Sequence, residues 1–326
     1  MNRNNKNYQY GITMVDAEYA QEGIASIYLL EQDGQVAIIE TGTTHSVPYV
    51  EEVLQSKGLS FDDVAYVIPT HVHLDHAGGA GEFMHRCKNA KLIIHPFGAA
   101  HMIDPSKLIA GTIAVYGEKL FKKFYGEIRP INAARVIEAP GFFKLDFNGR
   151  ELQFFDTPGH ARHHFCVYDK QSKSIFTGDT FGIGYPQLTT QQGRLIFAAT
   201  TPVQFDPGSL LQSIDCLMSL KPETMYLTHF GAITPSDDIV KQLKRSVRKF
   251  ANIALDAQDV FNKNSGSIYS NSESRVDYIQ QKLKDYLLDT IEEMGAIEPR
   301  EFYEKNINFD TKLNAQGLDF WLSKST

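Results

Sequence analysis

Cysteine is scarce in this chain of 326 residues, and no apolar run is long enough to cross a membrane. Its three cysteines are odd in number and far apart, which does not suggest a disulfide framework. Residues 1–11 are polar and rich in asparagine, and they lack the apolar stretch that a secretory signal needs. We therefore expect a soluble protein of the reducing cytoplasm that has no membrane partner.

Positively charged residues are also fewer than negatively charged ones. The 32 lysines and arginines are outnumbered by 39 aspartates and glutamates, so the formal net charge is −7. That balance argues against a nucleic-acid partner bound by neutralising phosphates. Apolar residues make up 42% of the chain and charged residues 22%, an ordinary globular composition that excludes global disorder. The expected partner is a small-molecule substrate. A homodimer is also possible from the sequence.

Short apolar runs alternate with helical patterns as far as residue 234, which favours a layered α/β fold. We expect strands at residues 11–15, 24–30, 35–40, 64–68, 92–95, 143–147, 151–156, 165–168, 174–177 and 224–228. The dipeptide Asn148-Gly149 predicts a type I′ hairpin turn. Residues 107–125 predict one amphipathic helix, which suits a lid over a site or a helix packed on the core equally well.

The character of the chain changes after Pro235. Residues 236–261 and 275–294 show long helical patterns, and only residues 267–269 between them resemble a strand. We therefore expect two domains, which are a core at residues 1–234 and a helical C-terminal extension at residues 235–326.

Four side chains of the kinds that bind metals stand within six residues, directly after the strand expected at residues 64–68. They are His71, His73, Asp75 and His76. Imidazole and carboxylate groups suit zinc, iron or manganese. A polar surface loop is the ordinary alternative, but such loops rarely place three histidines and an aspartate so close together.

Three later residues, His160, Asp179 and His229, each stand just beyond the end of an expected strand. In α/β folds the loops at the carboxyl ends of strands gather into functional sites. We therefore expect these three side chains to share a site with the histidine cluster.

The combined pattern of His-x-His-x-Asp-His, Thr-Pro-Gly-His, Gly-Asp and a final His resembles that of the metallo-β-lactamase fold hydrolases, and within them a glyoxalase II and lactonase-like branch. The resemblance covers roughly residues 10–235 and implies an αββα four-layer sandwich with a dinuclear metal site at one edge. It implies two divalent metal ions, with zinc expected and iron or manganese as alternatives. The implied metal ligands are His71, His73 and His160 for one ion, Asp75, His76 and His229 for the other, and Asp179 as a bridge.

The first motif departs from that family, because Glu40 stands before a Thr-Gly pair where an aspartate is usual. That position supports the ligands and is not one of them, so a glutamate is expected to shift the surrounding geometry without removing a ligand. His163 and His164 also lie near the motif in sequence, and we interpret them as supporting or solvent-exposed residues.

A complete ligand set of this kind implies a hydrolase. Two metal ions about 3.5–4 Å apart lower the pKa of a shared water, so that a metal-bridging hydroxide can attack a small ester, thioester or lactone. Asp75 is the expected catalytic residue, which holds the nucleophile and passes a proton to the leaving group. Lactonases of this fold carry a tyrosine soon after the bridging aspartate, whereas the first one here is Tyr185. The alternative function is that of a persulfide-dioxygenase-like oxidoreductase, which keeps much of the pattern but uses one iron.

Overall fold

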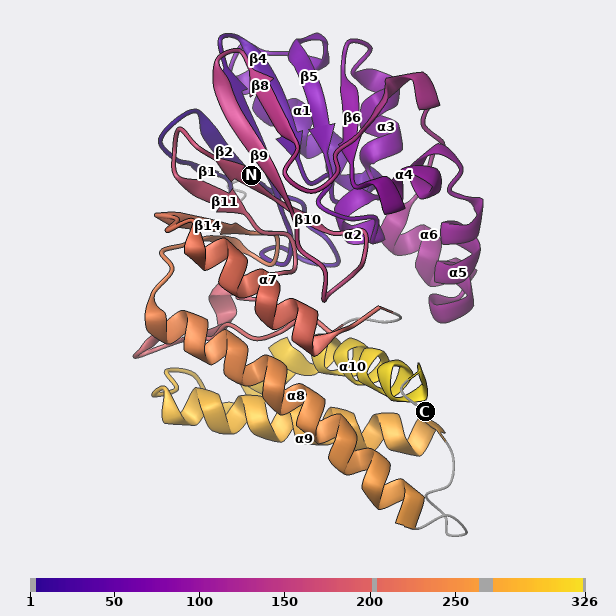
Figure 1. Cartoon of the computed structure of the whole chain (residues 1–326), viewed down its shortest axis with the longest axis vertical. Helices are drawn as coiled ribbons and strands as arrows, with labels where there is room; N and C mark the ends of the chain where they lie inside the picture. Colours follow the sequence, from indigo (N-terminus) through magenta and orange to yellow (C-terminus); the bar gives the residue numbers. More distant parts are fainter. Residues whose placement is uncertain (1–3, 201–203, 264–271, 325–326) are drawn as a thin grey trace. The chain divides into compact units, whose positions relative to one another are not determined.

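The computed structural model describes residues 4–200, 204–263 and 272–324 (Figure 1). The described residues form two compact units. The first unit consists of the described residues up to Asp156, together with residues 163–178 and 221–234. A second unit takes 157–162, 179–220 and the residues from Pro235 onward. The second unit thus joins two stretches of the predicted core to the C-terminal helices, and the predicted domain boundary at residue 234 stays a prediction.

The first unit contains two β-sheets, and the larger has its strands in sequence order. Its strands are β1 (Lys6–Asn7), β2 (Ile12–Asp16), β3 (Ser26–Gln32), β4 (Gln35–Ile39), β5 (Val64–Ile68), β6 (Lys91–Ile94) and β7 (Val136–Glu138). The strands from β1 to β4 pair antiparallel, whereas β4 to β7 pair parallel. Parallel pairing needs crossover connections, and helices supply them here.

The second sheet of this unit has the strand order β15-β14-β11-β10-β9-β8. Its strands are β8 (Lys144–Phe147), β9 (Arg150–Asp156), β10 (Phe165–Asp169), β11 (Ser174–Phe176), β14 (Thr224–Leu227) and β15 (Gly231–Ile233). The hairpin between β8 and β9 turns at Asn148 and Gly149, whose φ angles are 52° and 81°. Both are positive, as the predicted type I′ turn requires. All ten expected strands are found with ends shifted by at most a few residues, whereas β1, β7 and β15 were not expected.

Aromatic side chains join the two sheets. The ring of Tyr28 on β3 lies edge-on to Phe176 on β11, with 5.3 Å between ring centroids, and its hydroxyl donates to the carbonyl of Leu227. Tyr66 on β5 meets Phe147 on β8 in the same way at 5.8 Å. These contacts form a core between the sheets, because each ring buries a large apolar area.

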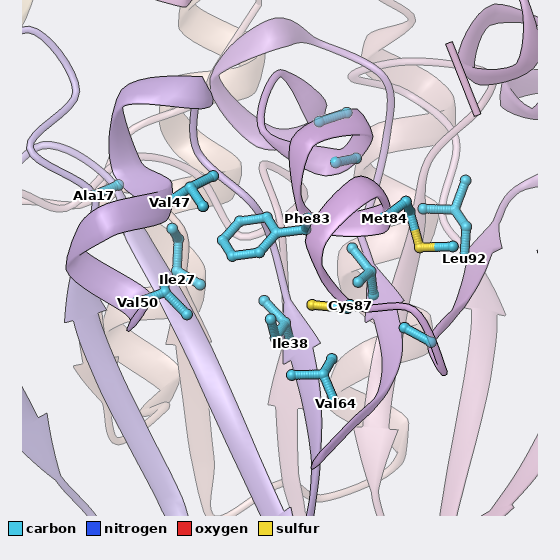
Figure 2. Packing of buried hydrophobic residues seen from close by; sticks show 14 of the residues in the cluster. Ala17, Ile27, Ile38, Val47, Val50, Val64, Phe83, Met84, Cys87 and Leu92 are labelled. Carbon is cyan, nitrogen blue, oxygen red and sulfur yellow. The ribbon is translucent and has the colours of Figure 1, made fainter. Parts of the chain in front are cut away.

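Helices cover the outer face of the larger sheet. They are α1 (Val47–Ser56), α2 (Leu74–Ala77), α3 (Ala80–Arg86), α4 (Pro96–Ile103), α5 (Ser106–Tyr116) and α6 (Glu118–Tyr125). Figure 2 shows Val47 of α1 and Phe83 of α3 packed over Ile27, Ile38 and Val64 of the strands. Apolar burial of this kind is the main stabilising contribution to such a layer.

The single helix expected at residues 107–125 is wrong, because the chain breaks into α5 and α6 at Gly117. The φ angle of Gly117 is +77°, a left-handed conformation that a helix interior does not allow. The apolar spacing continues across the break, which is why periodicity alone predicted one helix.

The second unit is mainly helical. Its helices are α7 (Pro207–Ser219), α8 (Asp237–Lys263), α9 (Ser272–Glu293) and α10 (Arg300–Lys324), and a two-stranded sheet pairs β12 (Thr189–Thr190) with β13 (Gly193–Arg194). The strand suggested at residues 267–269 lies outside the described residues. Two sheets with helices and a C-terminal helical extension confirm the predicted fold class. Within the described part of the chain, no helix combines the length and apolarity needed to cross a membrane.

Candidate metal centre

The histidine motif begins directly beyond the end of β5, in the first unit. His71 is fully buried, and its Nε2 lies 2.9 Å from Nδ1 of His73. The other ring nitrogen of His71, Nδ1, lies 3.1 Å from the hydroxyl of Thr70. His73 is the N-cap residue of the short helix α2, so the chain turns into a helix there and Asp75 and His76 fall in its single turn. A strand end followed by one helical turn therefore gathers the four side chains of the motif.

Asp75, His76 and His229 form a group that could hold a metal ion. Each offers one ligand atom, and these atoms all lie within 4.8 Å of one another. Oδ2 of Asp75 lies 3.7 Å from Nε2 of His76 and 3.5 Å from Nε2 of His229. His229 follows β14, far along the chain from the motif, so the fold brings this group together.

His160 and Asp179 lie in the second unit and are neighbours there. Nε2 of His160 is 3.3 Å from Oδ2 of Asp179, and both side chains are buried. Nδ1 of His160 lies 3.1 Å from the carbonyl oxygen of Ala199, and because a carbonyl only accepts, Nδ1 carries the proton. Nε2 of His160 is therefore the acceptor nitrogen of the ring, and it lies on the side of the ring that faces the carboxylate of Asp179.

The donor set fits a metal ion. Nδ1 of His76 donates to Glu40 at 2.9 Å and Nδ1 of His229 to the carbonyl of Ile24 at 2.9 Å, as that of His160 does to Ala199. Each ring is thereby held in the tautomer that leaves Nε2 as an acceptor. Metal-binding histidines are usually held in this way by an acceptor on the far nitrogen.

Glu40 holds three parts of the first unit with one carboxylate. Its Oε1 accepts from the Thr70 hydroxyl at 2.6 Å, from His76 Nδ1 at 2.9 Å and from the Thr228 hydroxyl at 2.8 Å. Its Oε2 accepts from the backbone amide of Thr70 at 3.0 Å. The supporting role predicted for this position agrees with these contacts, although the motif spacing does not indicate Thr70 or Thr228 as its partners.

His163 and His164 are buried beside His71. The ring centroid of His164 lies 4.9 Å from that of His71, and that of His163 lies 6.1 Å away. A side chain at residue 178 would not fit here, because a Cβ on Gly178 would lie 2.4 Å from Nε2 of His164. These histidines are therefore packed against the motif, as a supporting role requires, and are not solvent-exposed.

His95 and Tyr185 each make contacts within their own unit. His95 caps the start of α4 through Nδ1, and its Nε2 lies 3.3 Å from Asp156. Burial lowers the pKa of His95, and the nearby Asp156 carboxylate opposes that shift. The hydroxyl of Tyr185 donates to the carboxylate of Asp310 at 3.0 Å, which places this tyrosine in contact with α10.

Comparison with known proteins gives the same fold. A family model described as the metallo-beta-lactamase superfamily matches residues 20–229, a range that contains all seven predicted ligands. The metallo-beta-lactamase fold-containing protein ST1585 of Sulfurisphaera tokodaii is 27% identical over 226 residues, which are 68% of this chain and 78% of that protein. The solved structure of ST1585 from Sulfolobus tokodaii has a TM-score of 0.59 at 24% identity and covers 74% of this chain and 87% of its own.

Two similar proteins are named as hydrolases. The acyl-coenzyme A thioesterase MBLAC2 of Bos taurus is 26% identical over 185 residues, which are 52% of this chain and 63% of that protein. A hydroxyacylglutathione hydrolase of Shewanella baltica (strain OS155) is 28% identical over 206 residues, which are 62% of this chain and 60% of that protein. This chain therefore spans less than two thirds of either hydrolase.

Proposed function

This chain belongs to the metallo-beta-lactamase superfamily, and we propose that it is a metal-dependent hydrolase. It uses two divalent metal ions, with zinc as the expected metal, to cleave a small ester, thioester or lactone. A thioester is the favoured substrate. The thioesterase and the hydroxyacylglutathione hydrolase among its relatives support that choice. They also support the proposed place in the glyoxalase II and lactonase-like branch.

The observation that carries the proposal is the pre-oriented set of imidazoles. Three histidines from separate parts of the sequence each donate through Nδ1 to a protein acceptor, which leaves Nε2 for a metal. We propose that the seven residues bind the ions as the family pattern implies. The first ion is assigned His71, His73 and His160, the second Asp75, His76 and His229, and Asp179 contacts both.

Divalent metal ions, when bound, supply Lewis acidity that polarises a substrate carbonyl and makes water more acidic. Asp75 is the proposed proton carrier, because it is the accessible member of its group. Its side chain is 22% exposed, whereas those of His76 and His229 are 0% and 7% exposed. A carboxylate in that position can hold the attacking water by a hydrogen bond and pass its proton to the leaving thiolate or alkoxide.

Substrate profiling of the full-length chain tests this function. We expect turnover of acyl thioesters to exceed that of aryl esters, lactones and phosphodiesters, and Asp75→Asn to lower kcat by roughly 10²- to 10⁴-fold. His85→Ala, which changes an exposed histidine on α3, is the matched control and is expected to keep full activity. Undiminished thioester turnover by Asp75→Asn would contradict the assignment of the proton carrier.

A persulfide-dioxygenase-like oxidoreductase with one iron remains the competing function. No contact in the described residues favours it over hydrolysis. Oxygen consumption with a persulfide substrate, in the absence of any ester or thioester turnover, would replace the proposed function by this one.

A further inference from the structure

A short buried segment at residues 195–200 in the second unit has an unusual set of backbone partners. Every residue of the segment is at most 1% exposed. Arg194, which precedes the segment, is half-buried. Phe197 pairs with Ile183 through an isolated bridge, and the amide of Leu195 donates to the carbonyl of Leu188 at 3.0 Å. Buried backbone groups need hydrogen-bond partners, and the amides of Ile196, Ala198 and Thr200 find theirs in side chains of the C-terminal helices.

Helix α8 binds two backbone amides of this segment. Oε1 of Gln242 accepts from the amide of Ile196 at 2.8 Å. Oγ of Ser246 accepts from the amide of Ala198 at 2.9 Å. Gln242 and Ser246 are four residues apart, so they lie on one face of α8 and reach alternate residues of an extended segment.

Helix α10 binds the same segment through Asn314, which is fully buried. Its Nδ2 donates to the carbonyl of Ala198 at 3.3 Å, and its Oδ1 accepts from the amide of Thr200 at 2.6 Å. One amide side chain therefore fixes the backbone on both sides of Ala199. An amide is suited to this task, because it offers a donor and an acceptor together.

Ala199 lies between these two contacts, and its carbonyl accepts from Nδ1 of His160 at 3.1 Å. On the other side of the ring, Nε2 of His160 lies 3.3 Å from Asp179. The orientation of the ring, and hence the direction of its Nε2 lone pair, depends on the position of the Ala199 carbonyl.

We propose that Asn314 is a positioning residue for His160, acting through the Ala199 carbonyl, so that the C-terminal helices take part in building the metal site. The inference rests on the proposed function, because it needs His160 to bind a metal ion. An acceptor held rigidly behind a ligating histidine keeps the ring in the tautomer and direction that binding requires. Asn314 therefore influences metal binding without touching the metal.

The test compares two asparagines of the same helix in the full-length chain. Asn314→Ala is expected to weaken the binding of one of the two zinc ions by roughly 10- to 100-fold, as measured by competition with a chelator. The d–d spectrum of the Co²⁺-loaded protein is expected to change with it, because the ligand field at one ion changes. Asn306→Ala is the control, since Nδ2 of Asn306 donates to the carbonyl of Phe302 in its own helix and not to the segment at residues 195–200. It is expected to leave zinc affinity and the Co²⁺ spectrum unchanged.

Ser246→Ala serves as a second variant if Asn314→Ala does not fold. It removes the partner of the Ala198 amide and is expected to weaken zinc binding in the same direction, to a smaller degree. Folded variants at residues 314 and 246 with wild-type zinc affinity and an unchanged Co²⁺ spectrum would overturn this inference alone. A wild-type chain that binds no zinc, cobalt, iron or manganese would overturn the proposed function, and the inference with it.

Discussion

Glu40 stands out among single residues, because its one buried carboxylate holds Thr70, His76 and Thr228. These contacts join the ends of β4, β5 and β14. A carboxylate offers acceptor sites on both oxygens, so it satisfies all four donors without a donor of its own. Because a carboxylate oxygen accepts, Nδ1 of His76 is the donor in this contact and Nε2 is the acceptor nitrogen of the ring.

We predict that Glu40→Gln weakens zinc binding roughly 10- to 100-fold. Glutamine offers one acceptor oxygen where Glu40 offers two, so a donor now bound at Oε1 or Oε2 faces an amide nitrogen instead. The network that fixes the ring of His76 is thereby disturbed. Zinc titration against a chelator measures the effect, with Glu51→Gln on the exposed surface of α1 as the control. Equal zinc affinities for both variants would show that Glu40 has no part in positioning His76.

The reactivity of the Cys87 thiol tests how well the core of the first unit buries it. Burial raises the pKa of Cys87 to about 12, so at pH 8 on the order of one thiol in ten thousand is ionised. We predict that iodoacetamide modifies Cys87 slowly in the folded chain and rapidly after unfolding in guanidinium, as followed by mass spectrometry. Modification of Cys87 in the folded chain as fast as that of the partly exposed Cys216 would contradict the packing of the core in Figure 2.

At the scale of elements, the strands were predictable because their apolar runs are short and are bounded by turn residues. The Asn148-Gly149 hairpin was predictable for the same reason, since its local chemistry demands two positive φ angles. The break at Gly117 was not, because the apolar spacing of α5 continues into α6. Hydrogen bonds such as that between Ala198 and Asn314 join residues 116 positions apart, and no local pattern in the sequence reports them.

The break between α5 and α6 gives a pair of glycine variants with opposite effects. Gly117→Ala is expected to destabilise the fold by about 1 kcal/mol, because its φ of +77° strains an L-residue. Gly111→Ala, in the interior of α5 with open space around its Cα, is expected to stabilise the fold by about 0.4–1 kcal/mol. Urea unfolding of both variants measures the difference. Two changes of the same sign would place the helix break elsewhere.

At the scale of the whole molecule, the second unit takes His160 and Asp179 together with α8, α9 and α10. The sequence predicted the extension as a separate part, because its composition changes at Pro235. Gln242, Ser246 and Asn314 of that extension bind the segment whose Ala199 carbonyl accepts from the predicted ligand His160. The seven candidate ligands follow from the resemblance that the motifs carry and stay a prediction. The groups that contact their rings could not be predicted, since backbone carbonyls and distant side chains carry no motif.

Metal removal is expected to lower the free energy of unfolding, because a metal ion that binds only the folded chain stabilises it. A ligand that binds only the folded state at one hundred times its Kd contributes about 2.7 kcal/mol. We predict that treatment with a chelator lowers the Tm and that added zinc restores it, as followed by circular dichroism. A Tm that is the same with and without metal would argue that these residues do not bind metal in the folded chain.

Metal quantification of the purified full-length chain by plasma mass spectrometry, together with thioester turnover, tests most directly whether this chain is a two-metal hydrolase. We expect two divalent ions per chain, chiefly zinc, and thioester turnover that disappears on chelation and returns when the metal is added back. One iron per chain, with oxygen consumption and no thioester turnover, would contradict it.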